Sequence, residues 1–398
     1  MSISGPWQRT AVGAGLLKAD GVIRPTIFAE MSALASSTGA INLGQGFPDE
    51  DGPAEVLDAA RRAISEGLNQ YPPGLGMPVL REAVAEHQRR FYGLDLDPDR
   101  QVLVTAGATE AIAAVILAFV DDGDEVVTLE PFYDAYGGLI ALSRGEHRTV
   151  PLRLPDFLPD HDDLRAAVTD RTKLIVINNP HNPTGTVLPR ETLELIVELA
   201  HEHDALIVTD EVYEHLTFGH QHIPIATLPG AWQRTITISS GGKTFNTTGW
   251  KVGWITARHK LITAIVAVKQ FLTYVNAAPF QPAIAVGLGL PDEYFTGIAD
   301  DLRHKRDVLS AGLAKAGFGV FESQASYFVV ADAAPLGFSD GTELCRQLPE
   351  LAGVVAVPIS AFCHDDLGAE YSSLVRFAFC KRVDVLELAA KQLSRLGR

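Results

Sequence analysis

The chain is organised around one stretch, Ser239-Ser240-Gly241-Gly242-Lys243-Thr244-Phe245-Asn246-Thr247-Thr248-Gly249-Trp250-Lys251-Val252-Gly253-Trp254. It follows Thr235-Ile236-Thr237-Ile238, a β-branched run that predicts a short buried strand. Glycines let the backbone approach a bound group closely, and hydroxyls with backbone amides suit a phosphate. A lysine held there can do amine chemistry on a carbonyl. An isolated S-x-x-K is more often a polar loop with a solvated lysine, so the interpretation depends on the neighbouring strands.

Chemistry-bearing residues also follow the other strands that the pattern predicts. These are A-G-A-T-E (106–110) after strand 101–105, Pro131-Phe132-Tyr133 after 125–129, N-N-P-H-N-P-T-G (178–185) after 172–177, and Asp210 with Tyr213 after 205–209. Strands separated by helices imply a parallel, helix-covered sheet, in which ligands bind beyond the carboxyl ends. Each feature alone has a plain alternative: an ordinary turn, a core aromatic, a self-bonded asparagine or a helix-capping aspartate. Their convergence on one sheet edge predicts one shared site.

These motifs resemble those of pyridoxal-phosphate aminotransferases of fold type I, in the class I/II branch, and the resemblance runs from about Arg24 to Lys381. Within that branch the chain is similar to kynurenine–glutamine and methionine transaminases and to the actinobacterial group assigned as N-succinyldiaminopimelate aminotransferases. The stretches FAEMSAL (28–34), NLGQGFP (42–48) and GATEA (107–111) resemble the last group especially. The resemblance implies an α/β fold with a large, mostly parallel, helix-covered sheet and a smaller α+β domain.

The same resemblance implies a division into three segments. We expect residues 1–48 to form an N-terminal arm and the first segment of the small domain, 49–290 the large cofactor-binding domain, and 291–398 the second segment of the small domain. Helical patterns occur at 54–65, 77–92, 191–203, 260–275 and 293–316. Residues 1 to about 23 are expected to be irregular.

For the cofactor, the resemblance implies pyridoxal 5′-phosphate bound covalently to Lys243. Asp210 would pair with the ring nitrogen, Asn182 and Tyr213 would bond the ring oxygen, and Tyr133 would stack on the ring. Lys243, Asp210 and Tyr213 are therefore the expected catalytic residues. The expected phosphate-binding residues are Ala108, Thr109, Ser240, Lys251 and Tyr71 of the partner subunit.

For the substrate, the resemblance makes Arg376 the clamp for the α-carboxylate, a role that suits a planar guanidinium. On an edge strand Arg376 would instead be an ordinary solvated residue. Gly46 would contribute a backbone amide to the same carboxylate, and Asn182 would lie beside it. Phe28 and Phe47 are expected to line the donor pocket.

The donor is expected to be N-succinyl-LL-diaminopimelate, with glutamate and 2-oxoglutarate as the other pair. The positions matching Phe28 and the turn Asn276-Ala277 are smaller than in kynurenine transaminases, which leaves room for a long, flexible, partly polar side chain. One alternative is a broad-specificity transaminase for kynurenine, glutamine, methionine or aromatic amino acids. A second is a specialised biosynthetic transaminase, which would contain all of the motifs named above. A β-lyase acting on C–S bonds would use the same lysine and aspartate.

Bulk properties exclude other classes. The 398 residues are 46% hydrophobic and 21% charged, with a net charge of -16, which argues against nucleic acid and anionic membrane as partners. Cys345, Cys363 and Cys380 form no metal pattern and no disulfide framework, which fits a cytoplasmic protein without a metal site. The longest apolar run, 111–120, is too short to span a bilayer, and the first residues lack a signal-peptide pattern. The resemblance implies a homodimer with shared sites.

Overall fold

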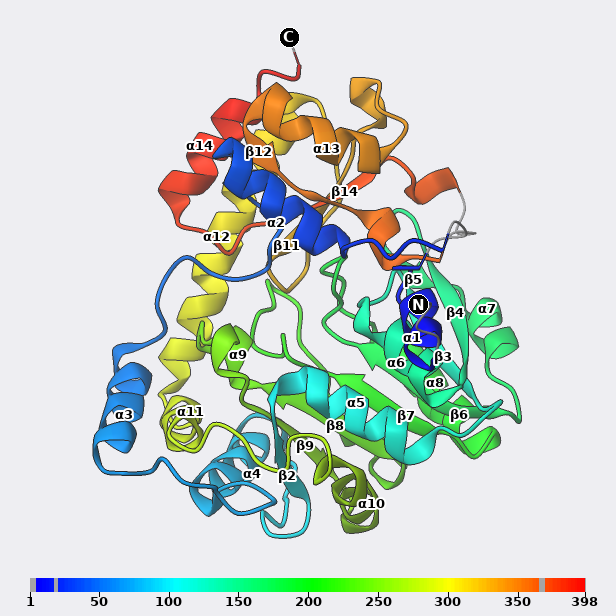
Figure 1. The fold of residues 1–398 in the computed structure, drawn as a ribbon, viewed down its shortest axis with the longest axis vertical. Helices are drawn as coiled ribbons and strands as arrows, with labels where there is room; N and C mark the ends of the chain where they lie inside the picture. Colours follow the sequence, from blue (N-terminus) through cyan, green and yellow to red (C-terminus); the bar gives the residue numbers. More distant parts are fainter. Residues whose placement is uncertain (1–4, 18–20, 365–368, 398) are drawn as a thin grey trace.

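A computed structural model describes residues 5–17, 21–364 and 369–397 (Figure 1). Two regions lie one above the other in this view, and the long helix α12 runs between them. The helices are α1 (Trp7–Gly13), α2 (Ile27–Thr38), α3 (Ala54–Ser65), α4 (Pro78–Tyr92), α5 (Gly107–Phe119), α6 (Ala135–Ser143), α7 (His161–Ala167), α8 (Arg190–Glu202), α9 (Gly241–Thr244), α10 (His259–Lys269), α11 (Phe280–Leu288), α12 (Asp292–Ala316), α13 (Gly341–Ala352) and α14 (Val383–Leu393).

The lower region is built on an eight-stranded sheet in the order β2-β9-β8-β7-β6-β3-β4-β5. Its strands are β2 (Val102–Thr105), β3 (Glu125–Glu130), β4 (Glu146–Arg153), β5 (Leu158–Pro159), β6 (Thr172–Asn178), β7 (Leu206–Asp210), β8 (Thr235–Ser240) and β9 (Gly253–Ala257). The run from β8 through β7, β6 and β3 to β4 is parallel, whereas β9 pairs antiparallel with both β2 and β8. The predicted mostly parallel sheet is therefore confirmed.

Helices cover both faces of this sheet, which is why its central strands are almost continuously apolar. Residues of α5, α6 and α10 pack on one face against side chains such as Val126 and Ile236. On the other face α8 packs against side chains such as Ile175 and Ile207. Helix α5 is apolar around most of its circumference because it lies between the sheet and α10. The last residues of β6, β7 and β8, which are Asn178, Asp210 and Ser240, line a cavity.

The upper region holds two smaller sheets. One has the order β10-β11-β14-β13 and is antiparallel, and the other is the parallel pair β1-β12. Their strands are β1 (Ile41–Asn42), β10 (Gly319–Val320), β11 (Phe328–Asp332), β12 (Val354–Val355), β13 (Val357–Pro358) and β14 (Leu374–Ala378). The pairing of β1 with β12 joins the first and last parts of the chain. It supports the proposed division at 48 and 290, which stays a proposal.

Two local expectations were wrong. The N-terminal arm is not irregular throughout, because α1 packs on α6, where a Cβ on Gly13 would lie 2.6 Å from the carbonyl oxygen of Gly137. The helix expected over 260–275 ends at Lys269, whose amine donates to the carbonyl of Tyr274 at 2.5 Å, in a turn where Tyr274 has φ 60°. Apolar residues continue beyond Lys269, so the sequence pattern alone does not show that the helix ends there.

Candidate active site

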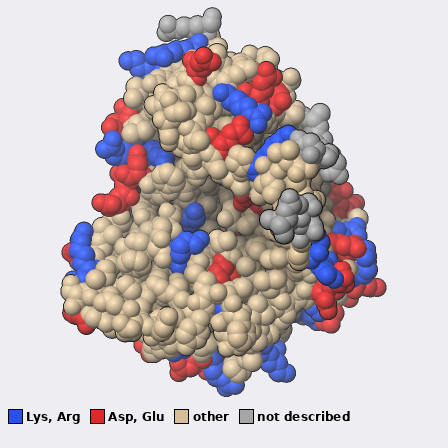
Figure 2. Space-filling view, in the orientation of Figure 1, with Lys and Arg blue, Asp and Glu red and all other residues tan. Residues whose placement is uncertain are grey.

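A cavity of about 300 Å³ lies at the carboxyl ends of the central strands. Figure 2 shows a hollow between the upper and lower regions, with lysine or arginine side chains inside it. The cavity brings together most of the residues expected from the sequence: Gly46, Phe47, Ala108, Thr109, Tyr133, Asn182, Asp210, Tyr213, Ser240, Lys243 and Lys251. They come from segments far apart in the chain, so the predicted convergence of strand ends is found in the structure.

Lys243 lies in α9, a single turn that begins directly after β8. Its amine donates a hydrogen bond to the hydroxyl of Tyr327 at 2.9 Å. Burial lowers the pKa of Lys243 from 10.5 to about 8, and the positive charges of Arg376 and Lys251 contribute in the same direction. A lysine with such a pKa has a substantial neutral fraction near neutral pH, which amine chemistry requires.

Asp210 ends β7 and is almost fully buried. One carboxylate oxygen accepts from the backbone N–H of Val212 at 3.3 Å, and the other accepts from the Tyr136 hydroxyl at 3.4 Å. Burial raises the pKa of Asp210 from 3.8 to about 6. Both hydrogen bonds are long, so this carboxylate has capacity for a further cationic donor, such as a protonated ring nitrogen.

The residues where α5 begins are suited to hold a phosphate, and we call them the phosphate cradle. Gly107 opens the helix with φ 75°, a conformation that favours glycine, and Lys251 donates to the Thr109 hydroxyl at 3.3 Å. A Cβ on Gly253 would lie 2.6 Å from the carbonyl carbon of Gly107, so two backbones approach closely here. Free amides, the positive helix end and a lysine together suit a phosphate, and Ser240 adds a hydroxyl from the last position of β8.

Arg376 is not on an edge strand, because β14 lies between β11 and β13. Its guanidinium is buried and donates to the side-chain oxygen of Asn182 at 2.9 Å and to the carbonyl of Gly44 at 2.8 Å. Its Nε has no hydrogen-bond partner among the described residues. The Phe328 ring lies 3.9 Å from the guanidinium carbon. Burial lowers the pKa of Arg376 to about 10, so the group stays charged and can receive a carboxylate.

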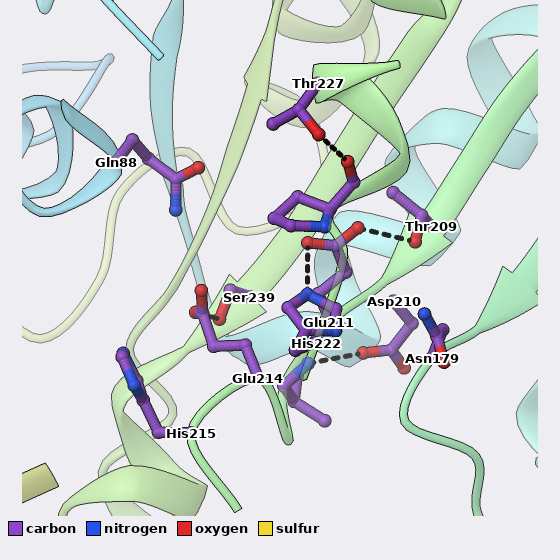
Figure 3. Close-up of polar contacts among 12 residues, drawn as sticks. Gln88, Asn179, Thr209, Asp210, Glu211, Glu214, His215, His222, Thr227 and Ser239 are labelled. Atoms are coloured by element: carbon purple, nitrogen blue, oxygen red, sulfur yellow. Dashed lines mark hydrogen bonds and ion pairs between the residues drawn. The ribbon is translucent and has the colours of Figure 1, made fainter. Parts of the chain in front are cut away.

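A cluster of buried polar residues beside Asp210 was not predicted from the sequence (Figure 3). Glu211 accepts from Thr209 at 3.0 Å and bonds His222 at 3.1 Å, while Glu214 accepts from Ser239 at 2.7 Å. Burial raises the pKa of Glu214 to about 7. The available signal was the acidic pattern D-E-V-Y-E at 210–214, directly after an apolar strand. These contacts fix the backbone that carries Asp210.

Next to this cluster, ligand atoms of His87, Glu214 and His215 lie within 4.8 Å of one another. The Nε2 atoms of the two histidines are only 2.6 Å apart and bond each other directly, so one ring donates to its neighbour. Burial lowers the pKa of His87 to about 3. The two imidazoles therefore satisfy each other as neutral rings.

Tyr71, Phe28 and Arg376 lie outside the cavity lining of this single chain. The Tyr71 side chain is 84% exposed and meets the Tyr274 ring at 6.1 Å. Phe28 lines a neighbouring hollow of about 390 Å³, with its ring 5.5 Å from the Arg376 guanidinium. Arg376 is hydrogen-bonded to Asn182, and Asn182 lines the cavity.

The turn at 276–277, which was expected beside the donor pocket, has a different contact in this chain. Asn276 donates to the carbonyls of Thr105 and Lys251, at 3.2 and 2.8 Å. Neither Asn276 nor Ala277 is among the residues that line the cavity. The turn therefore holds the backbone of two segments that border the phosphate cradle, at Thr105 and at Lys251.

Asn178 and Tyr327 are site residues that the sequence analysis missed. Asn178 accepts from the backbone N–H of Asn182 at 2.7 Å and donates to the carbonyl of Asp210 at 2.8 Å, so it ties two strand ends together. Its position at the start of the N-N-P-H-N-P-T-G string was a usable signal. Tyr327 directly precedes β11, where an aromatic residue is ordinary in a core, and no local pattern marks it.

The family profile described as aminotransferase class I and II matches residues 38–391. The chain belongs to this family. It is an enzyme, an aminotransferase of fold type I, and its cofactor is pyridoxal 5′-phosphate, as the sequence predicted. The lysine, the unfilled acceptor capacity of Asp210 and the cradle at Gly107 all fit that group.

Its relatives include a probable N-succinyldiaminopimelate aminotransferase, DapC, of Mycobacterium tuberculosis, which is 51% identical over 94% of this chain and 96% of its own. The methionine aminotransferase of Escherichia coli is 38% identical over 93% and 96%. The solved structure of N-succinyldiaminopimelate aminotransferase from Mycobacterium tuberculosis matches with a TM-score of 0.93 and 48% identity, over 99% of this chain and 100% of that one. Among the described residues, no helix has the length and apolar character needed to cross a membrane.

Proposed function

We propose that the enzyme moves the α-amino group between N-succinyl-LL-diaminopimelate and 2-oxoglutarate, with glutamate as the second amino acid of the pair. The observation that carries this proposal is the 51% identity, over nearly the whole of both chains, to a relative named for that substrate. Similarity to a methionine aminotransferase supports the alternative, a broader transaminase.

The residue roles expected from the sequence are part of the proposal. When bound, pyridoxal 5′-phosphate supplies a carbonyl that takes up the amino group and a ring that accepts electrons. Lys243 would hold the cofactor and afterwards, as a free amine, move a proton at the substrate α-carbon. Asp210 would keep the ring nitrogen protonated, and Tyr133 would stack on the ring. Asn182 and Tyr213 would bond its oxygen.

The binding roles follow the same geometry. Ser240, Lys251 and the amides of Ala108 and Thr109 would hold the phosphate. Arg376 would bind the substrate carboxylate, and its unpartnered Nε supports this role because a buried donor without an acceptor is costly. The Gly46 amide would complete the carboxylate site.

The surroundings of Phe28 and Phe47 support a long donor side chain. Phe47 lines the active-site cavity, and Phe28 lines a second hollow of about 390 Å³, which is bordered by residues within 12–16 and 24–30, by α13 and by residues within 358–364. That hollow is bordered by Arg24 and by Arg346, which is paired with Glu30. A side chain that is extended and carries polar groups has room there.

We also propose a homodimer with shared sites, in a reducing cytoplasmic setting. Tyr71 and Phe271 are more than four-fifths exposed, and Tyr274 is half exposed, so an aromatic surface supports burial by a second copy. Tyr71 of the partner subunit would then complete the phosphate site. The unpaired thiols of Cys345, Cys363 and Cys380 support the reducing setting.

The test is a panel of donors with 2-oxoglutarate as acceptor, scored by kcat/KM. The panel contains N-succinyl-LL-diaminopimelate, methionine, kynurenine and glutamine, with the Lys243→Ala variant as the background. We expect the succinylated donor to lead by about tenfold or more. A lead of that size for methionine or kynurenine would overturn the substrate and leave amino transfer in place. Release of pyruvate and ammonia from a β-substituted donor would instead indicate β-lyase activity.

A further inference from the structure

We propose that Tyr327 is the positioning residue for the free amine of Lys243, holding it through its hydroxyl while it donates its own hydrogen to the carbonyl of Gly46. This inference rests on the role proposed above for Lys243. Tyr327 is assigned no part in the binding of cofactor or substrate. It acts through the lysine.

The directions of the two hydrogen bonds of the Tyr327 hydroxyl support this role. The Tyr327 oxygen lies 2.5 Å from the Gly46 carbonyl oxygen, which can only accept, so the hydroxyl hydrogen points to Gly46. The Lys243 amine lies 2.9 Å from the same hydroxyl oxygen and must be the donor. A neutral amine held in this way uses one N–H, and its lone pair stays free. The free lone pair is what the amine needs to take up a proton or attack a carbonyl.

The Tyr327 hydroxyl has little freedom to move. The residue is 1% exposed, and the rings of Tyr213 and Phe328 pack edge-on against its ring at 5.3 and 4.8 Å. A Cβ on Gly46 would lie 3.0 Å from the Tyr327 ring, so the loop that contains Gly46 lies directly against it. The hydroxyl therefore links the amine to the proposed carboxylate site at a fixed point directly before β11.

Removing the hydroxyl has a definite electrostatic consequence. An acceptor stabilises the charged ammonium more than the neutral amine, so its loss must lower the pKa of Lys243. The other ionisable groups around the amine are Asp210, Tyr213, Lys251 and Arg376 on the side of the active-site cavity, and Glu50, Asp301, Lys305 and Cys380 around the small hollow. Of these groups, Tyr213 also shares a hydrogen bond with Tyr327. A shift in the variant therefore reports the hydroxyl.

The experiment compares Tyr327→Phe with Tyr371→Phe, which also removes a buried tyrosine hydroxyl, one that has no partner among the described residues. The full chain is loaded with pyridoxamine 5′-phosphate, so that Lys243 is free. It is then labelled with limiting acetic anhydride from about pH 6 to about pH 10, and the Lys243 peptide is quantified by mass spectrometry. We expect the labelling midpoint to fall by about half a unit or more in Tyr327→Phe and to stay at the wild-type value in the control. Coincident curves for Tyr327→Phe and wild type would overturn the proposal.

Two further measurements separate positioning from general structure. In Tyr327→Phe, kcat for the best donor should fall by about tenfold, with cofactor content unchanged and a smaller change in KM. If Tyr327→Phe does not fold, 3-fluorotyrosine at position 327 keeps the size and weakens the acceptor, and we expect a smaller shift in the same direction. An unshifted midpoint would again contradict the proposal. If the wild type transferred no amino group, the proposed function would be wrong. The labelling experiment would still test the contact between Tyr327 and Lys243, because it does not depend on turnover.

Discussion

The guanidinium of Arg376 and the side-chain oxygen of Asn182 are joined by a hydrogen bond of 2.9 Å. Arg376 belongs to β14 of the β10-β11-β14-β13 sheet, and Asn182 to the loop that follows β6 of the eight-stranded sheet. The proposed carboxylate clamp and the proposed ring-oxygen donor therefore fix each other's position. Movement of the upper region relative to the lower one would disturb both.

Arg376→Lys keeps the positive charge and loses the fork of N–H groups. We expect KM for the amino-acid donor to rise about 10- to 100-fold, with near-normal cofactor content, because an ammonium lacks the planar fork that can bond a carboxylate through two N–H groups and reach Asn182 as well. Steady-state kinetics and the absorbance of the bound cofactor measure both effects. Arg153→Lys, at an exposed ion pair with Asp163, is the control. An unchanged KM in Arg376→Lys would exclude the carboxylate role.

Lys243→Ala should abolish the visible absorbance of the lysine-bound cofactor and lower amino transfer by about 10³-fold or more, because no other residue is expected to carry the cofactor covalently. Spectra of the purified protein and single-turnover assays measure these losses. Lys391→Ala, at an exposed lysine of α14, should change neither. Full transfer by Lys243→Ala would be incompatible with the assigned role.

Asp210→Asn should stabilise the cofactor-free chain at alkaline pH. The folded pKa of about 6 lies above the ordinary 3.8, so the folded chain binds a proton between those values that the unfolded chain does not. Above about pH 6 the carboxylate is charged while buried, so there it lowers the free energy of unfolding most. We expect the variant to gain about 1–3 kcal/mol in free energy of unfolding at about pH 8, and much less at about pH 4.

Urea unfolding of the wild type, Asp210→Asn and the exposed control Asp300→Asn at both pH values measures that gain. With pyridoxal 5′-phosphate bound, we expect the wild type to be more stable than Asp210→Asn. A ring cation beside Asp210 stabilises the carboxylate, and the asparagine loses that attraction. Equal stability of the three cofactor-free proteins at about pH 8 would show that the buried charge carries no such cost.

Tyr71→Ala and Lys243→Ala should complement each other if the sites are shared. Each variant alone should be nearly inactive. Random exchange of subunits in an equal mixture would restore about a quarter of the native sites, because half of the dimers are hybrids with one intact site each. Activity is measured after mild denaturation and refolding of the mixture, against each variant treated alone. No recovery, or a fully active monomer by sedimentation, would contradict the shared-site dimer.

The strand ends were predictable because each carries its chemistry within a few residues, as the lysine after β8 and Asp210 after β7 do. Contacts across long sequence separations were not. The bond between Lys243 and Tyr327 joins the turn after β8 to the residue before β11, and Arg376 is buried only because β13 and β11 flank its strand. The helix α1 escaped the analysis for a similar reason, since its stability comes from packing on α6.

The pairing of Ile41 with Val354 in the β1-β12 sheet has a consequence for the order of folding. All strands of the large sheet lie between these two residues in the chain, so that sheet can assemble during synthesis while β1 still lacks its partner. The β1-β12 contact closes a loop that contains most of the protein, so we expect it to be among the last to form. Until the C-terminal residues leave the ribosome, the segment around β1 stays an unpaired strand edge, and we expect nascent chains at that stage to depend most on chaperones.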